Sequence, residues 1–333
     1  MTSGLHRQRP CRLAARSLAV VAVVVAVAAC GSPGAIVSTP AGEAAPASAQ
    51  GDVARIAAAE WSALPVDVRG ACAPANAWHS TLMEEAKAAT DDVLETLDAN
   101  QIVVPAEQRA VVAKAIRSDL FWRIVRNLLI GARLENIGGV RLPSVKTASG
   151  EPLWVFRSAF TGDPQRPGSC VDTLIAGAGV RHIVNLYAGP MPTADLEAAE
   201  RAAVTGAGGT YATLRDDPSA QQWREQAREG EDLRPAMEAV ASILRDKILR
   251  PGGKAPIGHV QVHCGGGMHR TGMVIGVLER CVGGLDSQSV TARYKHHVGW
   301  IDATHPGGFE AGNLRLIETF DCTLLGDDAA KPR

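Results

Sequence analysis

The stretch with the clearest chemical potential runs from residue 263 to residue 272 and reads HCGGGMHRTG. Cys264 and Arg270 are separated by five residues, a spacing that lets a loop curl until its backbone N–H groups surround an oxyanion. The three consecutive glycines in between permit the backbone angles that such a loop needs. The guanidinium of Arg270 offers a planar fork to two phosphate oxygens. The pattern therefore predicts a phosphate-binding loop that carries a thiol.

The sequence on either side of this loop favours a reactive thiol. Residues 257–263 have the pattern of a strand that leads directly into the loop, and a helix is expected to begin near Thr271. The positive end of that helix favours thiolate over thiol at Cys264, and cysteines in such settings have pKa values of about 3.5–7.5. A thiolate that faces a bound phosphate is placed for in-line attack. A buried cysteine in a glycine turn is the alternative interpretation, which this spacing disfavours.

The pattern His-Cys-x-x-Gly-x-x-Arg-Thr-Gly resembles the signature of the protein tyrosine and dual-specificity phosphatase superfamily. Residues 136–140, 156–159 and 179–186 resemble the opening strands of its bacterial, dual-specificity-like branch, and the resemblance covers roughly residues 136–326. It implies a phosphatase-like α/β fold and hydrolysis of phosphomonoesters through a cysteinyl-phosphate intermediate. A rhodanese-like sulfur carrier is disfavoured, because a histidine precedes the cysteine and Thr-Gly follows the arginine.

The resemblance implies a role for each residue of the loop. Cys264 is the nucleophile, and Arg270 binds the phosphate in both the ground state and the transition state. Thr271 steadies the thiolate and helps it to leave in the second step, while His263 tunes the thiolate from behind. The backbone amides that bind the substrate belong to Gly265, Gly266, Gly267, Met268 and His269.

A general acid must protonate the leaving oxygen, and a carboxylate on a mobile loop performs this step. In the family this is an aspartate that follows the strand before the long helix, and Asp216 and Asp217 occupy that place here. The separation from Cys264 is longer than in the family, which an inserted helical stretch over 221–234 accounts for. Asp217 is preferred because Pro218 after it suits a loop exit, and Asp216 is second. The reading of both as surface turn residues stays open.

The charge of the loop bears on the substrate. Family members that act on inositol phosphates or phosphoinositides tend to carry lysine inside the loop, whereas His269 is the only residue at positions 265–269 that can carry charge. Singly phosphorylated substrates, such as phosphotyrosine peptides or small phosphomonoesters, are therefore expected. Inositol phosphates or phosphoinositides are the alternative, with Arg293 or Lys295 supplying the charge. An alternative of another class is a phosphate-binding module without turnover.

Four histidines, at 269, 296, 297 and 305, raise the question of a metal. His296 and His297 are interpreted instead as the polar end of a helix. The cysteinyl-phosphate mechanism needs no metal and no other cofactor.

The N-terminus has the pattern of a signal peptide. An unbroken apolar run over 18–29 is shorter than the roughly 20 residues that span a bilayer, and Cys30 follows it in the context Ala-Ala-Cys-Gly. This context resembles a bacterial lipobox, which implies a lipid-anchored exported protein, in the outer membrane facing the periplasm. An ordinary signal peptide is the alternative. The basic residues before the run are Arg7, Arg9, Arg12 and Arg16.

The charge balance bears on partners. Removing residues 1–29 takes away four arginines and no acid, so the formal charge changes from −1 to −5. An acidic mature chain gives no reason to expect nucleic acid as a partner. The expected partners are a phosphorylated substrate and a membrane reached through the lipid anchor.

The rest of the chain divides by composition and periodicity. The predicted parts are a signal peptide at 1–29, a flexible tether rich in Gly, Ser, Pro and Ala at 30–52, a helical extension at 53–135, an α/β phosphatase domain at 136–326 and a disordered tail at 327–333. In the domain, expected strands alternate with expected helices, which predicts a mostly parallel sheet flanked by helices. The strands are 153–156, 180–186, 211–214 and 257–263, and the helices are 193–204, 233–249, 273–281, 287–297 and 309–325.

The chain has seven cysteines, and four of them have no role assigned above. These are an even number in a compartment that oxidises thiols, so two disulfides are one interpretation and four free thiols are the other. Their pairing stays open at this point. They are Cys72, Cys170, Cys281 and Cys322.

Overall fold

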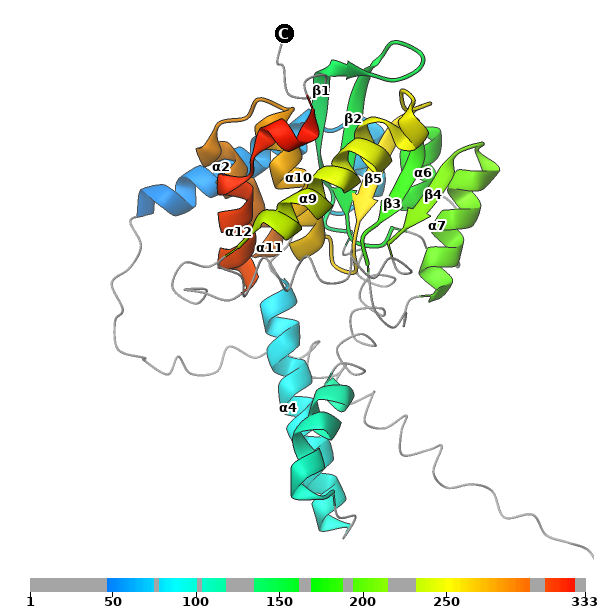
Figure 1. Cartoon of the computed structure of the whole chain (residues 1–333). Coiled ribbons are helices and arrows are strands. Elements are labelled where there is room, and N and C mark those ends of the chain that lie inside the picture. The colour runs from blue at the N-terminus through cyan, green and yellow to red at the C-terminus, as the bar shows by residue number, and fades with distance from the viewer. Residues whose placement is uncertain are drawn as a thin grey trace, which may run out of the picture. The chain divides into compact units, whose positions relative to one another are not determined.

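The computed structural model describes most of the chain from residue 47 onward (Figure 1). The predictions for the signal peptide, Cys30, Asp216, Asp217 and the C-terminal tail lie outside the described residues. Within the part that the structure describes, no helix combines the length and the apolar character needed to cross a membrane. The described ranges are 47–74, 78–100, 104–117, 135–161, 169–187, 194–214, 232–299 and 309–326.

A five-stranded sheet forms the centre of the protein, in the order β1-β2-β5-β3-β4. Strands β2, β5, β3 and β4 are parallel, and the edge strand β1 pairs antiparallel with β2. The predicted α/β fold with a mostly parallel sheet is therefore confirmed. The strands are β1 (Gly138–Lys146), β2 (Pro152–Ser158), β3 (Val180–Asn185), β4 (Thr210–Thr213) and β5 (His259–His263).

Helices cover both faces of the sheet (Figure 1). On one face, Val155 and Val262 pack with Met273 and Val277 of α10 and with residues of α9 and α12. On the other face, strand residues pack with α3 and α6. The helices are α2 (Ala47–Ala63), α3 (Val66–Ala71), α4 (Trp78–Ala99), α6 (Cys170–Ala176), α7 (Ala194–Gly206), α9 (Arg234–Ile243), α10 (His269–Cys281), α11 (Ser287–Val298) and α12 (Phe309–Thr319), and residues 106–117 are also helical.

Several element boundaries differ from the sequence prediction, and two of the differences change how a segment is interpreted. Helix α2 begins at Ala47, so the last six residues of the predicted tether, 47–52, are helical. The helix expected over 309–325 ends at Thr319, and Arg280 donates to the carbonyl of Phe320 at 2.8 Å, which satisfies an acceptor at the helix end. Asp321 then caps a short 3₁₀ helix, Cys322–Leu325, by accepting from the Thr323 N–H at 3.0 Å.

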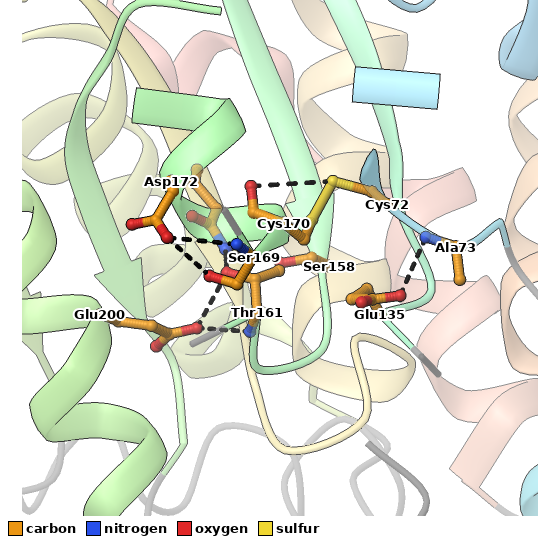
Figure 2. Close-up of a disulfide and its surroundings, with 10 residues drawn as sticks. Cys72, Ala73, Glu135, Ser158, Thr161, Ser169, Cys170, Asp172 and Glu200 are labelled. Carbon is orange, nitrogen blue, oxygen red and sulfur yellow. Dashed lines mark hydrogen bonds between the residues drawn. A yellow bond between two sulfur atoms is a disulfide. The ribbon is translucent and has the colours of Figure 1, made fainter. Parts of the chain in front are cut away.

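The four cysteines left unassigned by the sequence form two disulfides. Cys281 at the end of α10 is bonded to Cys322, and Cys72 after α3 is bonded to Cys170, the first residue of α6. Figure 2 shows the Cys72–Cys170 disulfide with Glu135 beside it. The carboxylate of Glu135 accepts a hydrogen bond from the backbone N–H of Ala73 at 2.9 Å. Cys264 is the one free cysteine within the described ranges.

The Cys72–Cys170 disulfide is one of several links between residues 47–74 and the α/β core. Pro74 forms a parallel bridge with Ile137, immediately before β1. In addition, the backbone N–H of Gly139 in β1 donates to the carboxylate of Glu60 in α2 at 3.0 Å. The boundary predicted at residue 136 therefore does not separate residues 47–74 from the α/β core.

Candidate active site

The glycine-rich loop lies at the carboxyl end of the central strand. Strand β5 ends at His263, Cys264 to Met268 form the loop, and α10 begins at His269. Because β5 runs parallel to both of its neighbours, the loop lies at the sheet edge where open α/β folds bind their ligands. The expected strand, loop and helix thus follow one another, and the helix begins two residues before Thr271.

The loop packs against the end of β2, and Gly267 makes the contact. Gly267 has a φ of +67°, and a Cβ added there would lie 2.5 Å from the carbonyl of Ser158 and 2.6 Å from the backbone nitrogen of Ala159. Both the left-handed backbone and the lack of room exclude a side chain at this position. The glycine run therefore fixes the path of the loop as well as permitting its curvature.

The thiol of Cys264 is held in an environment that favours its charged form. The residue is 7% exposed. Burial raises the pKa of the thiol, but hydrogen bonding by Thr271 and the charges of Arg270 and His263 outweigh burial, so that the pKa is lowered. Thr271 itself is fully buried in the first turn of α10. The predicted nucleophile and the predicted hydroxyl are thus brought together.

Arg270 lies in the same helical turn, next to the loop. It is 8% exposed, and its guanidinium carbon is 6.0 Å from the centre of the Tyr187 ring. Met268 is buried at the end of the loop, whereas His269 is half-buried at the start of α10. The helix begins with positive partial charge on its free N–H groups, so the loop, the arginine and the helix end all favour an anion at one place.

His263 is paired with a carboxylate that the sequence did not reveal. Its Nε2 lies 3.2 Å from Oε2 of Glu200 in α7, and both side chains are fully buried. Burial lowers the pKa of His263, but Glu200 and the neighbouring Cys264 outweigh this effect and raise it. The imidazole therefore favours its positive form, and its charge is one of the influences that lower the pKa of the Cys264 thiol.

The carboxylate of Glu200 is itself held by hydrogen bonds. Its Oε1 accepts from the Thr161 N–H at 2.6 Å and from the Thr161 hydroxyl at 3.1 Å, and its Oε2 accepts from the Tyr211 hydroxyl at 3.3 Å. Burial raises the pKa of Glu200, but His263 and these bonds outweigh it and lower the value. Glu200 is an acidic residue on the buried face of α7. An acid on the apolar face of an expected helix is the signal by which the sequence could have indicated that Glu200 has a buried partner.

Two buried side chains hold the loop from behind by its carbonyl oxygens. Asn136 donates from Nδ2 to the oxygen of Gly266 at 2.9 Å, and Arg157 donates to the oxygen of Gly267 at 2.8 Å. Both side chains are 1% exposed. Fixing the carbonyl oxygens on this side fixes the orientation of the peptide units in the loop. Both residues lie in the stretches that resemble the phosphatase strands, but the sequence pattern indicates no role for either side chain.

One expectation about the C-terminal helices is wrong. His297 is 1% exposed, and it contacts Asn136 and Glu60, so it belongs to the interior rather than to a polar helix end. Arg293, one of the two cations named for the alternative substrates, forms an ion pair with Glu279, with NH1 2.6 Å from Oε1. Both residues lie on the side of α11 that contacts Glu60 of α2.

Of the comparisons with known proteins, only the one with solved structures found a match. No family model matches the chain, and no curated protein matches it. Among solved structures, the chain is similar to the core catalytic domain of the PP-IP phosphatase SIW14 from S. cerevisiae, a crystal structure in complex with citrate. The two share 16% identity over 50% of this chain and 80% of that chain, with a TM-score of 0.32.

Proposed function

We propose that the protein is a cysteine-dependent phosphomonoester hydrolase of the protein tyrosine or dual-specificity phosphatase type. The observation that carries the proposal is the geometry of the loop, in which Cys264 directly follows the central strand and Arg270 and Thr271 lie in the first turn of the helix after it. Thr271, Arg270 and His263 also lower the pKa of the Cys264 thiol against the effect of burial. The loop signature resembles that superfamily at each fixed position. A thiolate beside an anion-binding loop is the arrangement that nucleophilic catalysis at phosphorus requires.

The proposed reaction has two steps. In the first, the thiolate of Cys264 attacks phosphorus, an S–P bond forms, and the bond to the leaving oxygen breaks while that oxygen takes a proton from a carboxylic acid. In the second, water attacks phosphorus and gives its proton to the same carboxylate, and the S–P bond breaks. Arg270 and the amides of residues 265–269 bind the phosphoryl oxygens throughout. Thr271 stabilises the thiolate when it leaves.

Asp217 is proposed as the general acid, with Asp216 as second choice. The support is their position in the sequence, because the described part of β4 and the residue after it, Leu214, lead directly into this segment. Strand β4 runs parallel to β3 and β5, so its carboxyl end lies at the same sheet edge as Cys264. A segment leaving β4 therefore starts on the side of the sheet that carries the loop.

Singly phosphorylated compounds, either phosphotyrosine peptides or small phosphomonoesters, are the proposed substrates. The loop offers one arginine and the half-buried His269, and Arg293 is engaged by Glu279. Inositol phosphates and phosphoinositides are the alternative, and they need further cations around the loop. A substrate panel containing a phosphotyrosine peptide, p-nitrophenyl phosphate, phosphoinositides and inositol hexakisphosphate separates the two, with kcat/KM as the measure.

The same panel tests the rival from another class, a phosphate-binding module. Phosphate release from wild type under reducing conditions, and its loss in Cys264→Ser, supports the enzyme. Binding of phosphate or vanadate by wild type with no release from any substrate supports the module instead. Tests with EDTA belong in the same series, because the proposed mechanism uses no metal.

We further propose that the protein is an exported bacterial lipoprotein, anchored through Cys30 in the outer membrane and facing the periplasm. The two disulfides support export, because such bonds persist in oxidising compartments. Labelling cells with a radioactive fatty acid provides the test. Label in wild type and its absence in Cys30→Ala are expected, whereas equal label in both chains would exclude Cys30 as the anchor.

A further inference from the structure

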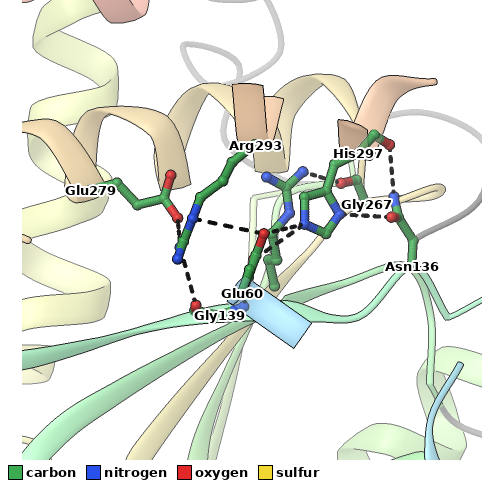
Figure 3. A network of polar contacts seen from close by, with 8 residues as sticks. Glu60, Asn136, Gly139, Gly267, Glu279, Arg293 and His297 are labelled. Atoms are coloured by element: carbon green, nitrogen blue, oxygen red, sulfur yellow. Dashed lines mark hydrogen bonds and ion pairs between the residues drawn. The ribbon is translucent and has the colours of Figure 1, made fainter. Parts of the chain in front are cut away.

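Helix α2, which precedes the catalytic domain in the sequence, places one carboxylate deep inside the protein. Glu60 is 2% exposed. Its Oε1 accepts from the Gly139 N–H at 3.0 Å, and both of its oxygens lie 3.2 Å from Nε2 of His297 (Figure 3). Arg293 approaches Oε2 at 3.9 Å. The carboxylate thus joins three segments that are far apart in the sequence.

The room for this carboxylate is provided by a glycine. A Cβ added to Gly138 would overlap Oε1 of Glu60 and would lie 2.6 Å from Nε2 of His297. Any side chain at 138 would therefore displace the Glu60–His297 contact. The first of the two glycines that open β1 is thereby explained by a specific contact with α2.

The contact continues from His297 to the catalytic loop. Nδ1 of His297 lies 2.8 Å from Oδ1 of Asn136. The amide nitrogen of Asn136 donates to two backbone carbonyls, those of Gly266 at 2.9 Å and His297 at 3.1 Å. These two acceptors fix the orientation of the amide, so Oδ1 is the acceptor and Nδ1 of His297 is the donor. Figure 3 shows the chain from Glu60 through His297 to Asn136.

With its other nitrogen donating to Asn136, the imidazole of His297 forms a hydrogen bond with Glu60 only when a proton lies between Nε2 and the carboxylate. Burial and Arg157 outweigh the opposing effect of Glu60 and lower the pKa of His297 to about 4. Burial raises the pKa of Glu60, but His297, Arg293 and Arg157 outweigh burial and lower it to about 2. The charged groups around the pair also include Glu279, which is bonded to Arg293.

We propose that Glu60 is a positioning residue of the active site, which holds the Gly266 carbonyl through His297 and Asn136 and so keeps the loop amides directed at the phosphate. The proposal rests on the proposed phosphatase function, since it concerns the same loop. It assigns a role to α2, a helix outside the stretch that resembles the phosphatase superfamily. Glu60 does not touch the substrate in this account and acts only through the two side chains that follow it.

Three variants of Glu60 separate positioning from bulk stability. Glu60→Ala removes the contact with His297. Glu60→Leu removes it while filling the volume, and it serves if the alanine variant does not fold, because apolar groups often replace buried ionic groups without loss of stability. Glu60→Gln keeps a group that can donate to Nε2. Asp52→Ala is the matched control, because Asp52 lies on the same helix and bonds Gln288 of α11 at 3.4 Å on the exposed surface.

The readouts are vanadate affinity and the pH dependence of Cys264 alkylation, both measured well below the melting temperature, together with kcat and KM. Positioning predicts that Glu60→Ala or Glu60→Leu weakens vanadate binding about 10-fold or more, which corresponds to about 1.4 kcal/mol. It also predicts that Glu60→Gln recovers most of the lost affinity and that Asp52→Ala matches wild type. Vanadate affinity equal to wild type in folded Glu60→Ala or Glu60→Leu overturns the proposal, even if the melting temperature falls.

Failure of the proposed function is recognised separately. If wild type binds vanadate but releases no phosphate from any substrate, the enzyme assignment fails, while the vanadate affinities of the Glu60 variants still decide the positioning role.

A double variant adds a second criterion for the positioning role of Glu60. Glu60→Ala and Asn136→Ala act through one chain of contacts, so their effects on vanadate affinity should be far less than additive. Additive effects would contradict the proposal.

Discussion

The imidazole of His263 and the carboxylate of Glu200 lie 3.2 Å apart, and both side chains are fully buried. The pair raises the pKa of His263 and lowers the pKa of Glu200 from the ordinary values of 6.5 and 4.5. A buried positive imidazole next to the loop therefore depends on a residue from α7. This dependence makes Glu200 part of the site even though it lies far from the signature in the sequence.

Glu200→Gln should destabilise the protein by about 3–5 kcal/mol, as expected when one partner of a buried ion pair is removed. The loss should depend on pH. The raised pKa of His263 contributes stability below pH 6.5 that is lost at higher pH, and the lowered pKa of Glu200 contributes stability above pH 4.5 that is lost at lower pH. Urea denaturation across this range should show the largest difference between about pH 4.5 and 6.5.

Glu238→Gln is the control for this series, because Glu238 forms an exposed ion pair with Arg234. Exposed pairs contribute about 0–1 kcal/mol, so the control should change little at any pH. An equal loss of stability in both variants, or no pH dependence for Glu200→Gln, would argue against a charged His263–Glu200 pair.

Thr271→Val should raise the pKa of the Cys264 thiol, because hydrogen bonding by Thr271 is the largest influence that lowers it. Interactions of a polar group with a charged partner favour the charged form, so removing the hydroxyl should move the pKa of the thiol upward. The rate of alkylation by iodoacetamide, followed against pH, measures the thiol directly. The acid limb of kcat/KM should move to higher pH by the same amount.

Thr205→Val is the matched control, since Thr205 is an exposed residue of α7 whose hydroxyl donates to the Arg201 carbonyl at 2.7 Å. It should leave the alkylation profile where it is in wild type. An unchanged profile in Thr271→Val as well would show that the hydroxyl does not support the thiolate.

Loss of the Cys72–Cys170 bond should cost more stability than loss of Cys281–Cys322. The closed segments differ in length, with sequence separations of 98 and 41 residues. A chain-entropy estimate gives about 4.7 and about 3.9 kcal/mol. Double alanine variants compared by urea denaturation under oxidising conditions measure both. The reverse order would mean that local contacts, rather than loop closure, dominate the effect of these bonds.

Asp217→Asn should reduce turnover most for substrates with poor leaving groups, such as alkyl phosphates. The effect should be smaller for p-nitrophenyl phosphate, whose leaving group needs little protonation. Asp216→Asn is the matched comparison, since it makes the same change at the adjacent position. If only Asp216→Asn shows this dependence on the leaving group, the two roles are exchanged, and if neither does, the acid lies elsewhere in the segment after β4.

The parts of the site that the sequence predicted are contiguous in the chain. The strand, the glycine-rich loop and the start of α10 follow one another within residues 259–281, so local periodicity and the spacing of Cys264 and Arg270 were sufficient. The short helix α6 was missed, although its start carries a recognisable signal. Ser169 and Asp172 form a capping box there, and an S-x-x-D pattern before apolar residues is typical of a helix start.

The supports of the loop were missed because they act across long sequence separations. His297 and Glu60 are 237 residues apart, Asn136 and Gly266 are 130 apart, and Arg157 and Gly267 are 110 apart. Nothing in the local pattern shows which buried polar residue meets which carbonyl, since that depends on how strands and helices pack. A buried polar group must find a partner, so such residues mark a network, but the sequence does not identify its members.

The proposed phosphocysteine on Cys264 can be trapped and located by mass spectrometry. Wild type is mixed with p-nitrophenyl phosphate under reducing conditions with EDTA present, quenched in acid during turnover, and digested for mass spectrometry, with Cys264→Ser treated in parallel. The account predicts one phosphoryl group on the peptide that contains Cys264, attached to the sulfur, and no turnover by Cys264→Ser. Phosphate release by Cys264→Ser at a rate comparable to wild type, or a phosphoryl group on another residue, would contradict it.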